Sequence, residues 1–567
     1  MKILLTITCA MAAGCVANPA HKPSSKTSSS APAIEEKAME VVKQITQKAA
    51  PLEKESNLAY WKATTTGDKA SYEKVEKLEV AMRQLYSNKD QYELLKKARD
   101  FGLRDPLLAR QVTLLLNAME ENQIDEASRK RMVSLSTKVQ KTFSDFRGKM
   151  GKKEVSDNEI KDILRKDKDS AKLKAAWEAY KSKGAAVATT IIELVHERNK
   201  AARSRGFKDY YQMHLLLQEQ DPKEIKDLFD KLAKLTDEPF RKIKAKVDVE
   251  LAKRYGLDVD KLMPWHYQDP FFQESPKLKG VDLDSFFAGK DPRKIVQDFY
   301  TSIGLDPAGI LKRSDLYEKP GKMPHAYCTN MDRSGDIRIL ANLRPDEQWT
   351  STLMHEMGHG VYDLFTNPKL PWLLRQPAHS FTTEAIAMMF GRQTRNPQWL
   401  IKAAGVDPEK VKVVEKDITF NQRLGMLVFA RWAMVMMNFE RQMYANPDQD
   451  LNKLWWDLKE RYQLLRRPEG RDEPDWASKI HIAVWPAYYH NYLLGECMAS
   501  QVLDYLAKNI VKSKDPNHID MYGNKNIGTW LKEKIFAPGA SMRWDELLRT
   551  ATGDTLNPKF FASQFIE

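Results

Sequence analysis

The chain shows helical spacing of apolar residues from about Ile34 almost to its end. One clear run consists of Leu78, Val80, Met82, Leu85 and Tyr86, followed by Tyr92, Leu94 and Leu95. Steps of three and four residues place such side chains on one face of an α-helix. Glycine and proline are sparse in these runs, and there is no internal repeat. The pattern predicts one large, mostly α-helical body over residues 36–567.

The helical pattern is interrupted at residues 325–340. Two short extended runs, at 325–328 and 337–340, flank a polar segment that contains Gly335. Extended runs around a turn of this composition are typical of a β-hairpin. The edge of such a small sheet can bind an extended peptide as a further strand.

The first residues differ in composition from the body. Lys2 precedes an apolar run over residues 3–13, which is typical of a signal peptide and too short to cross a bilayer. The small residues before Cys15 resemble a bacterial lipoprotein signal. We therefore expect residues 1–14 to be a signal peptide and Cys15 to carry the lipid. Residues 15–35, rich in Ser, Pro and Lys, are expected to form a flexible linker.

Ordinary secretion, with cleavage after Ala17, is the alternative interpretation of the N-terminus. Both interpretations export the chain to the periplasmic or cell-surface side. In the first, the chain contacts a bacterial membrane through its lipid anchor only, and in the second it is secreted as a soluble protein. No later segment is long and apolar enough to span a bilayer.

Charge and cysteine content exclude some classes of partner and site. The formal net charge is +13, but Lys and Arg are interleaved with Asp and Glu. Because no groove-like pattern of basic and aromatic residues appears, we expect no nucleic-acid partner. With Cys9 in the signal peptide and Cys15 assigned to the lipid, only Cys328 and Cys497 remain, which are too few for a thiolate zinc site. Whether these two pair is left open, and we expect a monomer.

The HEMGH segment carries the clearest chemical signal. His355 and His359 are four residues apart on one helical face, where two neutral imidazoles can bind one Zn²⁺ at about 2.0–2.1 Å each. Glu356 projects roughly 100° away and can reach a water on the metal, which suits a general base. Gly358 and Gly360 leave room for a substrate backbone or for a neighbouring helix.

A third zinc ligand is expected on the following helix. We expect the HEMGH helix to begin near Asp346 and the next one at Ser380. Glu384 is the one acid in the otherwise apolar or hydroxyl-bearing start of that second helix. A carboxylate that enters a core needs a partner, and zinc would be that partner, since catalytic zinc usually has three protein ligands. A solvent-facing glutamate at a helix start is the alternative.

These segments together resemble a known family. HEMGH with a glutamate 25 residues after His359 is similar to the glutamate-zincin peptidases. The surrounding sequence, from about residue 36 to near the C-terminus, is similar to the angiotensin-converting-enzyme-like family of zinc peptidyl-dipeptidases. The segments that carry this resemblance are 197–203, 263–266, His325-Ala326, 475–482 and 486–492. The resemblance implies a two-lobed helical body with a deep central cleft, with the small β-hairpin beside the zinc helix, and release of C-terminal dipeptides from short peptides.

The resemblance also implies roles for individual residues. Glu356 and one zinc ion would activate water, and the oxyanion that forms needs donors placed in advance. His481 and Tyr492 would be those donors. His325 and the backbone of Ala326 would bind the substrate backbone near the cleaved bond. Lys479 and Tyr489 would bind the terminal carboxylate.

The chain departs from the family pattern at four places. Met388 stands where the family has an aspartate that orients a zinc histidine, so another group has to do this here. A glutamine that binds the terminal carboxylate has no counterpart around residues 286–292. His490-Asn491 replaces the family's chloride-binding arginine, so chloride dependence does not follow from the resemblance. The paired tyrosines also lie one residue further from His481.

Two alternatives to a peptidyl-dipeptidase stay open. The spacing to Glu384 and the tyrosine-rich segment are equally similar to the thimet-oligopeptidase family, whose members share the helical cleft fold and often cleave internally. An endo-acting oligopeptidase with the same site is therefore the first alternative. The second is a lipid-anchored protein that binds peptides without cleaving them. The sequence does not identify the physiological peptide.

Overall fold

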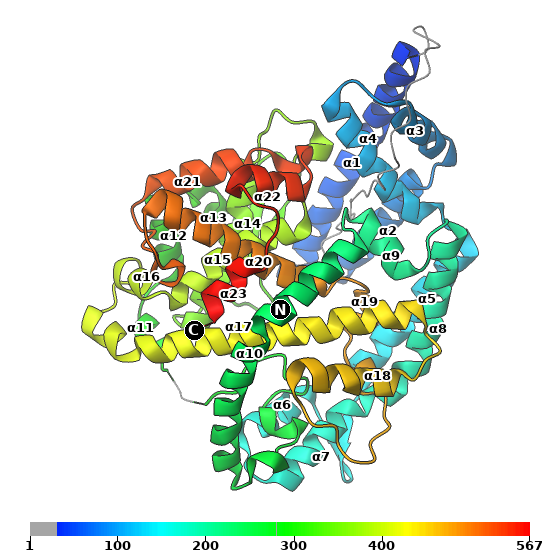
Figure 1. Ribbon diagram of the computed structural model, residues 1–567. Coiled ribbons are helices and arrows are strands. Elements are labelled where there is room, and N and C mark those ends of the chain that lie inside the picture. The colour runs from blue at the N-terminus through cyan, green and yellow to red at the C-terminus, as the bar shows by residue number, and fades with distance from the viewer. Residues whose placement is uncertain (1–30, 279–280, 567) are drawn as a thin grey trace.

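Helices dominate the structure. The computed structural model describes residues 31–278 and 281–566 (Figure 1), so Cys15, the predicted signal peptide and most of the predicted linker lie outside the described residues. Within the described part, the mostly α-helical class is confirmed, with only two small antiparallel sheets. The two-lobed shape with a deep cleft stays a prediction.

The first four helices form an N-terminal layer with its own apolar core. They are α1 (Ala31–Thr66), α2 (Lys69–Tyr86), α3 (Lys89–Phe101) and α4 (Pro106–Glu120). Ile45, Leu95 and Leu115 are fully buried in this core. The apolar run of residues 78–95 is divided between α2 and α3, and Val80 is exposed rather than buried.

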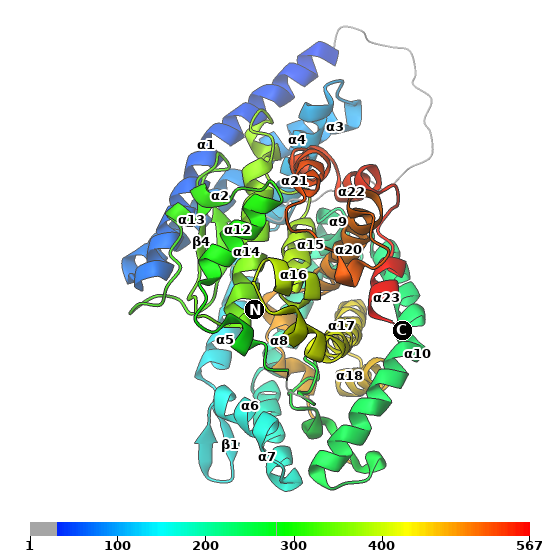
Figure 2. The same cartoon turned by 90° about the vertical axis from the view of Figure 1, so that its left-hand side faces the viewer.

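The next elements extend to the far end of the molecule and then return to the N-terminal layer (Figures 1 and 2). They are α5 (Glu126–Asp145), β1 (Gly148–Met150), β2 (Lys153–Val155), α6 (Asp157–Lys166), α7 (Ser170–Lys181), α8 (Lys183–Ser204) and α9 (Tyr210–Leu217). The β1–β2 hairpin is a second interruption of the helical pattern that the sequence analysis missed. Its strands are only three residues long, and Gly151, with φ of 62°, makes the turn between them.

Two long helices, α10 (Pro222–Tyr255) and α17 (Pro408–Ala445), cross the middle of the molecule (Figure 1). Asp221 and Asp407 cap their first turns by accepting hydrogen bonds from backbone N–H groups. Both helices also start with proline, which has no N–H to leave unsatisfied there.

The predicted hairpin is confirmed. β3 (Tyr327–Asn330) pairs antiparallel with β4 (Ile337–Leu340), with Tyr327 opposite Leu340. Three short helices precede this sheet: α11 (Asp284–Phe287), α12 (Pro292–Ser302) and α13 (Ala308–Arg313). His325 and Ala326 lie immediately before β3, and β3 packs against the HEMGH helix.

The HEMGH helix packs against the helix that follows it, and that second helix packs in turn against a helix near the C-terminus. The motif helix α14 (Glu347–Phe365) begins after Asp346, as predicted, and α15 begins at Ser380, also as predicted. The bounds of α15 and the helices after it are Ser380–Gly391 for α15, Pro397–Lys402 for α16, Leu451–Leu458 for α18, His481–Val484 for α19, His490–Tyr505 for α20, Lys525–Leu531 for α21, Trp544–Thr552 for α22 and Lys559–Phe565 for α23.

Two open questions on chemistry and topology have answers in the described part of the chain. No helix there is both long and apolar enough to cross a membrane. Cys328 on β3 and Cys497 on α20 form no disulfide with each other.

Candidate metal centre and active site

The two helices that carry the predicted ligands lie in direct contact. A Cβ at Gly358 of α14 would come within 2.7 Å of the Ala387 Cα on α15, so glycine allows this close approach. A Cβ at Gly360 would instead meet Ile310 and Cys328. Both glycines therefore make room for neighbouring elements of the chain, which is one of the two uses that the sequence suggested.

The structure brings the three predicted ligands together. The Nε2 atoms of His355 and His359 lie 3.3 Å apart. Glu384 Oε2 is 3.6 Å from His355 Nε2, and its Oε1 is 3.7 Å from His359 Nε2. Ligand atoms placed tetrahedrally at about 2.0–2.1 Å from one Zn²⁺ are roughly 3.4 Å apart. Two imidazole nitrogens and one carboxylate oxygen therefore fit one zinc ion.

This group stands out among the described residues. It is the one cluster of at least three His, Cys, Asp or Glu side chains there whose possible ligand atoms all lie within 4.8 Å of one another. The Glu384 carboxylate is buried, which removes the interpretation of it as a solvent-facing helix-start residue.

Thr383 contacts the second zinc histidine from outside the metal site. His359 Nδ1 lies 2.7 Å from Thr383 Oγ1, so this nitrogen can donate its proton to the hydroxyl and leave Nε2 free for a metal. The sequence analysis left open which group takes this place once Met388 replaces the family's aspartate. Met388 itself lies against Gly495 of α20.

Glu356 is almost completely buried, with 2% of its surface exposed, on the same turn of α14 as His355. Since the carboxylate of the expected general base is shielded by the fold, a folded protein surface cannot reach it.

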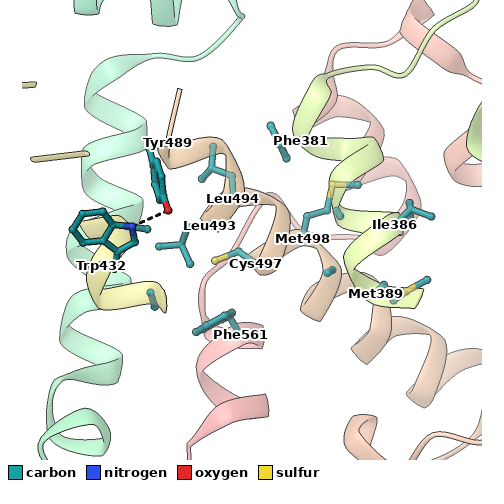
Figure 3. Close-up of a cluster of buried hydrophobic side chains, with 14 of the residues drawn as sticks. Phe381, Ile386, Met389, Trp432, Tyr489, Leu493, Leu494, Cys497, Met498 and Phe561 are labelled. Atoms are coloured by element: carbon teal, nitrogen blue, oxygen red, sulfur yellow. Dashed lines mark hydrogen bonds between the residues drawn. The ribbon is translucent and has the colours of Figure 1, made fainter. Parts of the chain in front are cut away.

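A second cluster contains the residues expected to bind a terminal carboxylate. Lys479 Nζ lies 5.4 Å from the centre of the Tyr489 ring, and the Tyr489 hydroxyl accepts a hydrogen bond of 2.7 Å from Trp432 Nε1 (Figure 3). Lys479 is 5% exposed. Burial lowers the pKa of its ammonium group to about 8, although Asp269 acts in the opposite direction.

Gln273 belongs to this cluster and was missed in the sequence. Its Oε1 accepts a hydrogen bond of 2.6 Å from Lys479 Nζ. The family pattern places such a glutamine around residues 286–292, where this chain has none. The Asp269 carboxylate accepts from the Gln273 backbone N–H and fixes the turn. The position of Gln273 could have indicated its role, because the turn that contains it comes directly after the family-like segment 263–266.

His481 and Tyr492 flank Tyr489. The Tyr489 ring lies 5.2 Å from the His481 ring and 5.2 Å from the Tyr492 ring, each measured between ring centres. Burial, with a smaller contribution from the Lys479 charge, lowers the pKa of His481 to about 3, so its imidazole is neutral. A neutral imidazole still donates one N–H.

Tyr492 connects this segment to the metal ligands. Burial, with a further contribution from the Glu384 charge, raises the pKa of Tyr492 far above its ordinary value. The phenol therefore keeps its proton as a donor. On the same helix, a Cβ at Gly495 would lie 3.5 Å from Glu384 Cβ, so α20 packs directly on the ligand helix.

His325 and Ala326 stand at the start of the hairpin. His325 is partly buried, and burial lowers the pKa of its imidazole. In the described part of the chain, β3 pairs with β4 only. The other edge of β3 is therefore the one to which a peptide strand would add.

A neutral hydrogen-bond network occupies the position of the family's chloride-binding arginine. His490 Nε2 is 2.7 Å from Gln220 Oε1, and Asn491 Oδ1 accepts a bond of 2.6 Å from Gln220 Nε2. Asn491 Nδ2 also donates to Gln218. Burial lowers the pKa of His490 to about 3, so this network carries no positive charge for an anion.

Comparison with known proteins identifies relatives over most of the chain. The family model described as angiotensin-converting enzyme matches residues 32–267 and 277–564. An angiotensin-converting enzyme of Haematobia irritans exigua is 24% identical over 453 residues, which cover 72% of this chain and 72% of that protein.

Two mammalian relatives are longer. The angiotensin-converting enzymes of Rattus norvegicus and Mus musculus are 24% and 25% identical over 435 and 447 residues, covering 70% and 72% of this chain. The matches span only 32% and 33% of those two proteins, so the chain corresponds to about a third of their length.

Proposed function

The chain belongs to the angiotensin-converting enzyme family, and from this premise we propose that it releases dipeptides from the C-termini of short peptides. Family membership makes it a zinc metallopeptidase that acts on peptides. The observation that carries the proposed exo-specificity is the hydrogen bond of 2.6 Å from Lys479 to Gln273, beside Tyr489. An ammonium, an amide and a phenol in one buried cluster suit a carboxylate.

The proposed chemistry begins at the three ligands. His355, His359 and Glu384 would hold one zinc ion, which supplies a Lewis acid for the scissile carbonyl and lowers the pKa of water. The Glu356 carboxylate would take a proton from the attacking water and pass it to the departing amine.

The second segment would stabilise the charge that develops on the carbonyl oxygen. His481, neutral because burial lowers its pKa to about 3, would donate one N–H to this oxygen. Tyr492 would donate its hydroxyl proton. These donors act in the transition state, whereas Lys479, Gln273 and Tyr489 act on the substrate terminus.

Substrate position follows from the two ends of this arrangement. The β3 edge with His325 and Ala326 would bind the peptide backbone before the cleaved bond. The cluster of Lys479, Gln273 and Tyr489 would bind the C-terminal carboxylate of the peptide. A fixed distance between the two would select the bond that releases a dipeptide.

Product analysis tests this proposal. A short peptide with a free C-terminus is incubated with the full chain, with and without a chelator, and the products are identified by mass spectrometry. Chelator-sensitive, stepwise loss of C-terminal dipeptides is expected. Internal cleavage would favour the endo-acting oligopeptidase, and binding without any cleavage would favour the non-catalytic peptide-binding protein.

We also propose that the chain is exported and anchored through a lipid on Cys15. The support is the sequence before that cysteine, in which Lys2 precedes an apolar run that ends in small residues. The mass of the mature N-terminus tests it. A lipid-modified Cys15 is expected, whereas an unmodified N-terminus at Asn18 would indicate ordinary secretion.

A further inference from the structure

The segment between His481 and Tyr489 contains a strained turn. Ala487 has φ of 52°, in the left-handed region that non-glycine residues rarely adopt, and it is fully buried. The turn lies where this chain places its paired tyrosines one residue further from His481. The His481 and Tyr489 rings are nevertheless only 5.2 Å apart. The left-handed residue lies in the segment that joins these two rings.

One buried carboxyl group holds this turn. Glu440 of α17 accepts a hydrogen bond of 2.8 Å from the Ala487 backbone N–H through its Oε1. Glu440 is 1% exposed, and burial raises its pKa to about 8, against the lowering effects of this hydrogen bond and of Arg198. A buried carboxyl is costly unless it is hydrogen-bonded, so this contact is a specific feature of the fold.

A second buried side chain holds the other side of the same segment. Arg198 of α8 donates to the Ala483 carbonyl oxygen at 2.7 Å and to the Tyr444 hydroxyl at 3.1 Å. Arg198 belongs to the segment 197–203, for which the sequence suggested no role. The backbone from Ala483 to Ala487 is thus fixed at both ends from two different helices.

We propose that Glu440 is a positioning residue that fixes the separation of His481 and Tyr492 by holding the left-handed turn at Ala487. It touches neither substrate nor metal. This proposal rests on the proposed function, in which His481 and Tyr492 donate hydrogen bonds to the developing oxyanion. The position of the residues that would bind the terminal carboxylate depends less on Glu440. Lys479 is held by Gln273, and Tyr489 is held by Trp432.

Three variants of the full chain test the proposal. Glu440→Ala should lower kcat about 100-fold, the effect of misplacing a catalytic group by about 1 Å, with KM changed much less. Glu440→Gln keeps the acceptor oxygen and should restore kcat close to the wild-type value. Asn438→Ala is the matched control. Asn438 lies on α17 two residues before Glu440, and its replacement removes a buried hydrogen bond to the Tyr462 hydroxyl. The variant should therefore have a lower Tm but an unchanged kcat.

Hydrogen exchange gives a readout that does not depend on activity. The Ala487 amide should exchange slowly in the wild-type chain and in Glu440→Gln, and faster in Glu440→Ala. If the wild-type chain cleaves no peptide, the proposed function fails while this measurement still decides the role of Glu440 in the turn.

Three results would overturn the proposal: wild-type kcat in Glu440→Ala, an unchanged exchange rate at Ala487, or a Glu440→Gln variant as impaired as Glu440→Ala. Should Glu440→Ala fail to fold, Ala487→Val tests the turn directly, because a β-branched residue disfavours positive φ. It should lower kcat in the same way, and wild-type kcat in that variant would also contradict the proposal.

Discussion

His359 Nδ1 lies 2.7 Å from the hydroxyl of Thr383, the residue immediately before the third predicted zinc ligand. One helix would thus provide both a ligand, Glu384, and the group that orients a ligand on the neighbouring helix. Such outer contacts fix the tautomer and ring position of a metal-binding histidine.

Replacement of Thr383 tests this contact. Thr383→Val removes the hydroxyl at nearly constant volume and should weaken zinc affinity about 10- to 100-fold. Thr383→Ser keeps the hydroxyl and should bind zinc close to normally. The measurement is zinc titration against a competing chelator at constant pH. Equal zinc affinity in Thr383→Val and the wild type would show that the hydroxyl does not orient His359.

Replacing the residues that would bind the terminal carboxylate should change KM only for substrates that have a free C-terminus. Lys479→Met and Gln273→Ala should each raise KM for a free-acid peptide, Lys479→Met by about 10- to 100-fold, because a charge-assisted hydrogen bond is lost. KM for the C-terminally amidated peptide should already be high and should change little. An amidated peptide cleaved as well as the free acid by the wild type would rule out the carboxylate role.

The pH dependence of KM follows from the same lysine. Burial lowers the pKa of Lys479 to about 8, so its ammonium form predominates below that pH and is lost as pH rises through it. KM for a free-acid peptide should therefore rise between about pH 7 and pH 9. Steady-state kinetics with the amidated peptide and with Lys479→Met supply the background dependence. A parallel profile in all three cases would contradict the assignment.

Burial of the site should restrict the enzyme to flexible substrates. Glu356 is 2% exposed and His359 is 7% exposed, so a rigid protein surface cannot contact them. A folded protein should stay intact under conditions in which the same protein, once unfolded and cut into short peptides, is degraded. Gel electrophoresis and mass spectrometry follow both reactions. Rapid cleavage of the folded form would mean that the site opens much further than this structure.

The local features of this fold could be predicted from the sequence. Asp346 and Ser380 mark the starts of α14 and α15, and the β3–β4 hairpin follows from two extended runs around a polar turn. These signals are local, since caps, turns and helical spacing act over a few residues.

The contacts that were missed are long-range or depend on tertiary packing. Gln273 meets Lys479 across 206 positions of sequence, and no spacing rule connects them. Thr383 was not predicted because the group that orients the histidine was expected at the position of Met388, five residues later on α15. The left-handed Ala487 was not predictable, because alanine ordinarily favours the helical region and the hydrogen bond that holds this turn comes from Glu440 on a distant helix.

The Glu356→Gln variant tests the central claim most directly. Glutamine keeps the size of the side chain and leaves His355, His359 and Glu384 in place, so the variant should fold and bind one zinc ion per chain. Chelator-sensitive cleavage of a short peptide should fall at least about 100-fold, the lower end of what a general base contributes. Wild-type turnover by a zinc-loaded Glu356→Gln chain would contradict the proposed mechanism.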